Sequence, residues 1–189
     1  MKRLGLSLAF LVACVVHGAA AEPRNWTIDA EASSLDVVYI INGDERRGFF
    51  ERFDGAGRFD VDALENADLD FFVEMESIDV GDAFGTFIIK TDDWFGAFEN
   101  PEGRFSLISL TPSEDGAFRF TGDLTLKGIT RTIEGDLSLN IDDETALATG
   151  RTEFDRSLFN IGVGFTALFV EVGDRVAVEF KIIAAPAEE

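Results

Sequence analysis

The sequence predicts an all-β fold of eight antiparallel strands with one short helical insert. Most segments alternate apolar and polar residues with a period of two, as half-buried strands do. Glycine-containing and asparagine-containing turns separate these segments, and a helical period occurs only between residues 82 and 98. Sequential antiparallel strands joined by short turns are typical of an up-and-down barrel or a sandwich.

The clearest element is a hairpin over residues 118–139. In its first strand Phe118, Phe120 and Leu124 share one face, while polar residues occupy the other. Lys127-Gly128 indicates a tight turn, after which the alternation restarts. Two strands alone are only marginally stable in water, so this hairpin needs further strands to cover its apolar face.

The other six long strands are expected, in chain order, at residues 34–41, 48–60, 68–76, 105–110, 146–155 and 175–183, and a short extended segment at residues 26–29 precedes them. Within residues 48–60, Phe50 and Phe53 are three positions apart and cannot share a regular strand face. This spacing predicts a bulge between Arg52 and Gly57, which would bend the strand and help to close a barrel.

The helical insert at residues 82–98 is unusually aromatic. Asp82 and Asp92 are expected to be N-caps of one or two short helical turns, which end before Pro101. Four aromatic side chains of the insert are expected at the lid or mouth of a pocket: Phe84, Phe87, Trp94 and Phe95. The alternative is that they form a plug that caps one barrel end.

The N-terminus has the pattern of a cleaved secretory signal peptide over residues 1–21. Lys2 and Arg3 precede an apolar run that is too short to span a bilayer, and small residues end at Ala21. Residues 22–189 then form a single domain. The alternative is lipoprotein processing at Cys14, which follows a lipobox-like Leu11-Val12-Ala13.

The composition excludes several kinds of chemistry from the mature domain. Cys14 and His17 are the only cysteine and histidine, and both lie in the expected signal peptide. The domain therefore has no disulfide, no Ser-His-Asp triad and no metal site built on imidazole or thiolate. We expect no cofactor.

The formal net charge is -20, and it becomes more negative when Lys2 and Arg3 are removed. Such a surface repels nucleic acid and anionic lipid, so we expect no nucleic-acid partner and no stable membrane insertion. The acidic residues are spread along the strands, which favours a solvated exterior; the alternative is a patch that docks a basic partner. An exposed edge at residues 26–29 would allow a homodimer.

Six short motifs, in this order, resemble those of the YceI-like family over residues 24–183. They are Trp26-x-x-Asp29 with Ser34, Gly48-x-Phe50-x-x-Phe53-x-Gly55, Ser77-Ile78, Trp94-Phe95 ahead of Pro101-x-x-x-Phe105, Gly122-x-Leu124-Thr125-Leu126-x-Gly128-Ile129-Thr130-Arg131, and Arg156-x-x-Phe159-x-Ile161-Gly162. The resemblance implies a secreted, periplasmic, lipocalin-like eight-stranded barrel. It also implies a polyisoprenoid chain, such as that of an isoprenoid quinone, held as cargo in an elongated internal pocket.

An eight-stranded barrel has an interior that side chains can fill or that can hold one small ligand. Apolar side chains expected inside the barrel or on the insert form the candidate ligand site: Phe71, Val73, Met75, Phe84, Phe87, Trp94, Phe95, Phe105, Phe118, Phe120, Leu124, Phe154 and Phe180. Composition alone favours a solid core, whereas the family resemblance favours a binding pocket. Arg156 is expected either to pair with a carboxylate and hold a loop or to meet a ligand head group.

Our first functional hypothesis is therefore a non-enzymatic carrier of an amphiphilic isoprenoid. A hydrolase that uses two carboxylates, as glycosidases do, is the second. The third is a structural or stress-protective barrel with a filled interior. A carboxyl group with a raised pKa in the interior would favour the enzyme, and an uncharged internal tunnel would favour the carrier.

Overall fold

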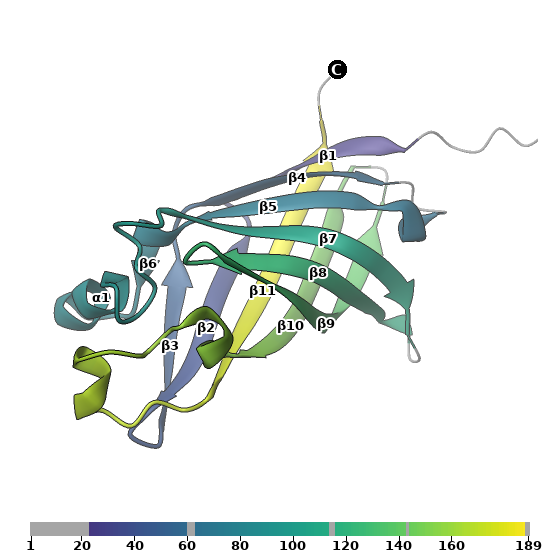
Figure 1. The fold of residues 1–189 in the computed structure, drawn as a ribbon. Helices are drawn as coiled ribbons and strands as arrows, with labels where there is room; N and C mark the ends of the chain where they lie inside the picture. The colour runs from purple at the N-terminus through teal and green to yellow at the C-terminus, as the bar shows by residue number, and fades with distance from the viewer. Residues whose placement is uncertain (1–22, 60–62, 114–115, 143, 188–189) are drawn as a thin grey trace, which may run out of the picture.

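A closed antiparallel β-barrel of eight strand positions, with one α-helix at one end, forms the body of the computed structural model (Figure 1). The structure describes residues 23–59, 63–113, 116–142 and 144–187, so the expected signal peptide lies outside it. The strands are β1 Arg24–Ile28, β2 Ser34–Ile41, β3 Asp44–Phe50, β4 Phe53–Phe59, β5 Asp68–Glu74, β6 Ile78–Asp79, β7 Glu102–Pro112, β8 Phe118–Leu126, β9 Ile129–Ile141, β10 Ala146–Asp155 and β11 Arg175–Pro186. The helices are α1 Ala83–Lys90 and the 3-10 turns η1 Leu64–Asn66, η2 Met75–Ser77, η4 Arg156–Phe159 and η5 Thr166–Phe169.

The eleven strands make eight barrel positions because three positions are each shared by two successive strands: β1 with β2, β3 with β4, and β5 with β6. Strands β1 and β2 lie end to end along β11, where Ile28 pairs with Ala184 and Ser34 with Lys181. Strands β3 and β4 share the next position, and the short β6 extends the sheet beyond β3. Strand β1 pairs with both β11 and β4 and so closes the barrel.

This pairing corrects the expected free edge at residues 26–29. Because both sides of β1 are hydrogen-bonded within the chain, it offers no unpaired edge to a second copy.

The bend in the expected strand 48–60 lies earlier than the spacing predicted. The break falls at Glu51 and Arg52, whereas β4 pairs regularly with β5 from Phe53 onward. Arg52 fixes this break, because its backbone N–H donates to Ser77 Oγ at 3.1 Å and its guanidinium pairs with Glu74. The two additional residues let both Phe50 and Phe53 be buried inside the barrel.

The hairpin over residues 118–139 is confirmed as β8 and β9. Lys127 and Gly128 occupy the left-handed region, with φ of 52° and 69°, as a tight two-residue hairpin turn requires. Expected strand 105–110 is longer in the structure, as β7, and it carries a register shift between Leu107 and Ser109.

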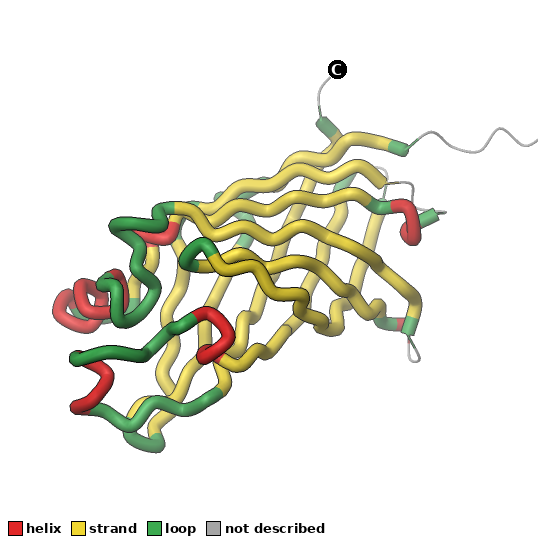
Figure 2. Tube along the Cα trace, in the orientation of Figure 1, coloured by secondary structure: helices red, strands yellow, loops and turns green. Residues whose placement is uncertain are grey.

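α1, η2, η4 and η5 lie with their loops at one end of the barrel, and η1 lies at the other end (Figure 2). Asp82 caps α1 as predicted, since its side chain accepts from the Gly85 N–H at 2.8 Å. Asp92 is not an N-cap: it lies in a turn, and no second helix follows it before β7. After Thr91 the chain forms a tight turn instead of a second helix. The Thr91 carbonyl accepts hydrogen bonds from both the Trp94 N–H and the Gly96 N–H.

Candidate functional site

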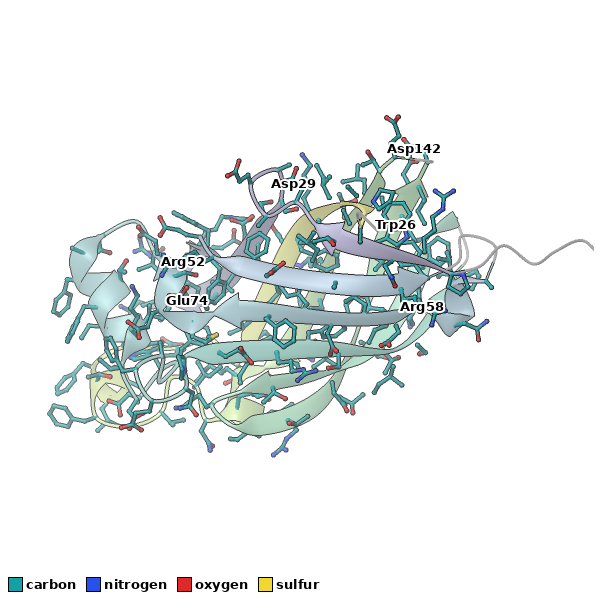
Figure 3. The ribbon with its side chains drawn as sticks, turned by 90° about the horizontal axis from the view of Figure 1, so that it is seen from above. Trp26, Asp29, Arg52, Arg58, Glu74 and Asp142 are labelled. Atoms are coloured by element: carbon teal, nitrogen blue, oxygen red, sulfur yellow. The ribbon has the colours of Figure 1, made fainter. Side chains whose placement is uncertain are left out.

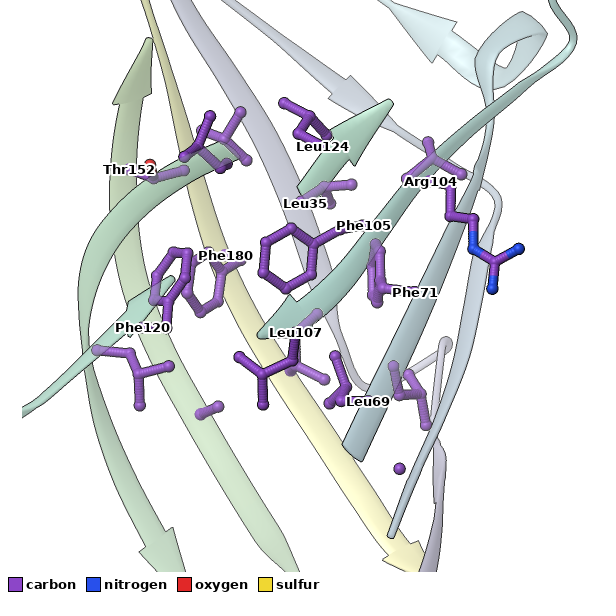
Figure 4. Close-up of a pocket in the computed structure, with 18 of the residues that line it drawn as sticks. Leu35, Leu69, Phe71, Arg104, Phe105, Leu107, Phe120, Leu124, Thr152 and Phe180 are labelled. Carbon is purple, nitrogen blue, oxygen red and sulfur yellow. The ribbon is translucent and has the colours of Figure 1, made fainter. Parts of the chain in front are cut away.

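An elongated apolar cavity of about 250 Å³ lies inside the barrel (Figure 4). It extends from Phe95, in the segment that follows α1, to Leu64 of η1 and Leu139 of β9. Side chains of β1 to β5 and of β7 to β11 line it. Inward-facing apolar residues from all eight barrel positions therefore surround one continuous space.

The interior is hollow rather than filled. Phe71, Phe105 and Phe180 point inward from three different strands, yet each is only half-buried because its ring faces the cavity. By contrast Met75 and Phe154 are fully buried close to the α1 end of the barrel. A solid core would bury all five equally, so the filled-core interpretation is wrong for the middle of the barrel.

Aromatic rings form a chain of contacts across the cavity wall. Phe105 of β7 packs edge-on against Phe120 of β8, with ring centroids 5.7 Å apart, and Phe120 contacts Phe180 of β11 at 6.1 Å. On the adjoining strands β4 and β5, Phe53 and Phe71 stack at 5.5 Å, and Phe71 pairs in register with Phe105. These contacts hold large rings in place around the cavity without filling it.

Most of the few polar groups at the cavity form hydrogen bonds or ion pairs with other groups of the protein. Thr152 Oγ1 donates to the Glu134 carbonyl at 2.7 Å. Arg104 touches the cavity, but its guanidinium points away from it (Figure 4) and pairs with Asp70 at 2.9 Å. The indole N–H of Trp26 has no hydrogen-bond partner among the described residues. The cavity therefore presents almost only hydrocarbon.

No carboxylate lines the cavity within the part of the chain that the structure describes. The described carboxyl groups with a shifted pKa are all shifted downward and lie outside it. Hydrogen bonds from Ser106 and Arg104 lower the pKa of Asp70, and those from Arg52 lower the pKa of Glu74. No observation therefore favours the carboxylate hydrolase.

Nine of the thirteen side chains proposed from the sequence lie on the cavity wall. They are Phe71, Val73, Met75, Phe95, Phe105, Phe120, Leu124, Phe154 and Phe180. Phe118 has the same parity as Phe120, but it lies at the far end of β8, opposite Pro112, and is not part of the wall. Whether any of the nine contacts a ligand stays a prediction.

The aromatic insert divides into two groups that its sequence did not separate. Phe95 reaches the cavity. Trp94 is buried next to it in the chain, outside the cavity wall, and its indole N–H donates to Thr166 Oγ1 at 3.1 Å. Phe84 and Phe87 lie on the outer face of α1, 76% and 57% exposed, so they are not part of a pocket lid or mouth in this structure. The reason is that α1 turns Ile89 inward instead.

Sequence reasoning missed other wall residues. Leu35 and Val37 of β2, Leu137 and Leu139 of β9, and Trp26 of β1 all line the cavity. Parity alone would have identified the leucines, because they alternate with polar neighbours as Phe120 does. The sequence identified Trp26 only as part of the Trp26-x-x-Asp29 motif, and not as a residue of the cavity wall.

Arg156 holds the segment between β10 and β11. Its guanidinium donates to four backbone carbonyls: Ile161 and Gly173 at 2.8 Å, Gly162 at 2.9 Å and Val172 at 3.2 Å. The expected loop-holding role is thus correct, but the partner is not a carboxylate. Arg156 does not line the cavity and is not placed to meet a ligand head group there.

The exterior carries the charge. All eight ion pairs found among the described residues lie at the surface, including Arg52–Glu74 and Arg119–Asp136. No group of three or more Asp, Glu, His or Cys residues in the described ranges could hold a metal ion.

None of the helices in the described residues is both long and apolar enough to cross a membrane.

Comparisons with known proteins agree on one family. Residues 26–184 match the family model described as the YceI-like domain. A UPF0312 protein of Vibrio campbellii is 27% identical over 171 residues, which cover 87% of this chain and 90% of the relative. A UPF0312 protein of Shewanella denitrificans is 27% identical over 131 residues, covering 68% of this chain and 69% of the relative.

Two solved structures share the fold. Burkholderia cenocepacia BcnA superposes with a TM-score of 0.76 at 25% identity and covers 84% of this chain and 99% of its own. A polyisoprenoid binding domain from Saccharophagus degradans, implicated in plant cell wall breakdown, superposes with a TM-score of 0.69 at 15% identity, covering 86% and 98%. With its closed barrel, its apolar cavity and a family match over residues 26–184, this chain belongs to the YceI-like family.

Proposed function

We propose that this protein is a carrier that holds a polyisoprenoid lipid, such as an isoprenoid quinone, in the barrel cavity within the periplasm. The observation that carries the proposal is a hollow interior lined almost entirely by apolar side chains from all eight barrel positions. An apolar, water-poor cavity with few polar groups is the usual form of a small-molecule site. The solved polyisoprenoid binding domain with the same fold supports the choice of ligand.

The energetics suit storage of a hydrocarbon chain. Each Å² of apolar surface removed from water stabilises a complex by about 25 cal/mol, before the costs of immobilising the ligand are subtracted. The cavity extends between Phe95, close to the α1 end of the barrel, and Leu139 of β9, so an isoprenoid chain would lie along the barrel. Binding of a hydrocarbon chain needs no group that exchanges a proton, and none of the carboxylates in the described ranges lines the wall.

The periplasmic location rests on the signal-peptide pattern of residues 1–21. The mass of the protein recovered from the secretory compartment tests it. Cleavage after Ala21 gives an unmodified chain that begins at Glu22. A chain that begins at a lipidated Cys14 would mean that the carrier is anchored to a membrane.

Mass spectrometry of an organic extract tests the cargo. Protein purified from its own secretory compartment is expected to release an isoprenoid in stoichiometric amount, and protein that was denatured, stripped and refolded is expected to release none. An empty extract from the folded native protein would overturn the proposal.

A pair of neighbouring variants shows whether the lipid lies inside the barrel. Ala148 faces the cavity between Leu139 and Ile182, whereas Thr149 next to it is exposed on the outside. Ala148→Phe should occupy the cavity and lower the amount of bound lipid at least severalfold, and Thr149→Phe should not change it. Equal lipid content in both variants would place the lipid elsewhere.

A further inference from the structure

Trp26 carries the one buried side-chain donor that the described part of the structure leaves without a partner. The residue is only 2% exposed, and its indole nitrogen has a hydrogen to donate but cannot accept. Buried polar atoms in folded proteins nearly always have a hydrogen-bond partner. Because Trp26 lines an apolar cavity, the unpaired N–H of this residue indicates a missing acceptor.

The ring of Trp26 is held rigidly at the cavity wall. It stacks on Phe59, with centroids 5.0 Å apart and planes 3° apart. Trp26 pairs across the sheet with Gly57 of β4, which has no side chain to cover the indole, and Figure 3 shows Trp26 on β1. Trp26, Phe59 and Gly57 all line the cavity.

The second tryptophan provides an internal comparison. Trp94 is also buried, at 8% exposure, but it lies outside the cavity wall and its N–H donates to Thr166 Oγ1. The fold therefore provides a hydrogen-bond acceptor for the buried indole that does not line the cavity. It leaves unsatisfied the one that borders the cavity.

The surroundings of Trp26 limit the acceptor to an uncharged group. Among the described residues that line the cavity, Arg104 is the only basic one, and its guanidinium is directed away from the cavity, to Asp70. A phosphate placed inside would be buried without a counter-ion, which is strongly unfavourable. The chain's net charge of -20 adds to this repulsion.

We propose that Trp26 Nε1 donates a hydrogen bond to a neutral oxygen at one end of the cargo. This inference rests on the proposed carrier function and narrows its ligand class. The cargo is an isoprenoid with an uncharged carbonyl or hydroxyl oxygen, as in a quinone or an alcohol. A prenyl phosphate and a pure hydrocarbon do not fit as well.

Binding of three ligands of equal chain length tests the assignment: geranylgeraniol, geranylgeranyl monophosphate and the corresponding hydrocarbon without the hydroxyl. Affinities are measured on the lipid-stripped, refolded protein by displacement of a fluorescent apolar probe. The alcohol is expected to bind about tenfold more tightly than the hydrocarbon, the value of one hydrogen bond, and more tightly than the phosphate. Trp26→Phe should abolish the preference for the alcohol, and Trp94→Phe should keep it.

Binding of the hydrocarbon distinguishes a failure of the carrier proposal from a failure of the Trp26 assignment. If no isoprenoid binds the wild-type protein, the carrier function itself is wrong. If the alcohol and the hydrocarbon bind equally well, or if Trp26→Phe retains the preference, only the Trp26 assignment is overturned. Unchanged hydrocarbon affinity in Trp26→Phe shows that the variant is folded with its cavity intact.

A measurement on the wild-type protein avoids any folding defect of the variant. Of the two indole N–H resonances in a nitrogen–proton NMR spectrum, that of Trp26 should move downfield when the alcohol is added. It should not do so with the hydrocarbon, and the Trp94 resonance should stay in place with both ligands. A Trp26 resonance that responds identically to the two ligands would overturn the assignment.

Discussion

The carboxylate of Asp93 accepts two hydrogen bonds from Thr166, one from the backbone N–H and one from the hydroxyl, each 2.7 Å long. The same hydroxyl oxygen accepts from the indole N–H of Trp94. Asp93 belongs to the turn after α1, and Thr166 begins η5, on the connection between β10 and β11. These bonds tie together the two segments that lie at the α1 end of the barrel (Figure 1).

The first prediction concerns acid stability. The two bonds from Thr166, the backbone one first, lower the pKa of Asp93 below its ordinary value, and nearby Lys127 acts in the same direction. Because the folded pKa is lower than the unfolded value of about 3.9, this stabilisation is complete above that pH and is lost as the pH falls through the folded pKa. Asp93→Asn should therefore lose less thermal stability than the wild type when the pH is lowered from about 5 to 3.

Thermal unfolding followed by circular dichroism measures this difference. Asp92→Asn is the matched control, since the Asp92 side chain accepts neither bond from Thr166. Identical pH profiles for Asp93→Asn and the wild type would contradict the prediction.

The second prediction concerns Arg156. Replacing it with methionine keeps much of the apolar stem but leaves four backbone carbonyls without their donor. Unpaired buried polar groups are costly, so the free energy of unfolding should fall by about 2–4 kcal/mol. Arg131→Met, which removes an exposed guanidinium that donates to the Thr130 carbonyl, should change it by less than about 0.5 kcal/mol. Chemical denaturation measures both, and similar losses would refute the holding role.

The third prediction concerns the close approach of Phe105 to Gly122. A Cβ at Gly122 would overlap the Phe105 ring and lie 2.8 Å from the Ser106 carbonyl oxygen. Gly122→Ala should force the ring to rotate and destabilise the protein by about 1–3 kcal/mol. Because Phe105 lines the cavity, the affinity for lipid should change as well.

Gly57→Ala serves as the comparison, because its nearest contact would be 3.2 Å and should cost less. Chemical denaturation compares the stability of the two variants. A lipid-displacement titration compares Gly122→Ala with the wild type, because Gly57 itself lines the cavity opposite Trp26. If Gly122→Ala changes neither the stability nor the lipid affinity, the prediction is wrong, and the Phe105 ring has free space on its other side.

The fourth prediction concerns ionic strength. With 36 acidic and 16 basic residues, the chain repels itself, and its ion pairs are exposed and individually weak. At about 0.1 M salt the screening length is about 10 Å, so added NaCl should raise the thermal midpoint by weakening the repulsion.

Glu179→Gln controls for the ion pairs themselves. Glu179 pairs with both Arg47 and Arg151, yet its loss should cost less than about 1 kcal/mol, because both arginines are exposed and the Glu179 side chain is itself 30% exposed. A midpoint that falls with added salt would show that the surface ion pairs outweigh the repulsion.

Local sequence patterns were enough to predict the strands and the tight turn. The alternation around Phe120 and Leu124 and the Lys127-Gly128 pair specify β8, its turn and its inward face. A strand's period and a turn's φ angles depend on neighbouring residues, so they can be inferred without the fold. The family resemblance supplied the barrel itself, which alternation alone could not distinguish from a sandwich.

The hollow interior could not be predicted in this way. Inward-facing phenylalanines look the same in a sequence whether opposite walls meet or stand apart. That separation depends on the number and pairing of all strands around the closed barrel. The same closure pairs both edges of β1, which the sequence suggested would be free.

Within the aromatic insert, the sequence determined that a short capped helix forms, but only the tertiary structure decided which aromatic residues face inward. Phe95 reaches the cavity while Phe84 is exposed, because the insert is anchored through Asp93 to Thr166, 73 residues along the chain. The unpaired indole of Trp26 likewise becomes apparent only when the barrel surrounds it. Burial and hydrogen-bond partners are set by contacts between distant segments, and a local pattern carries no information about them.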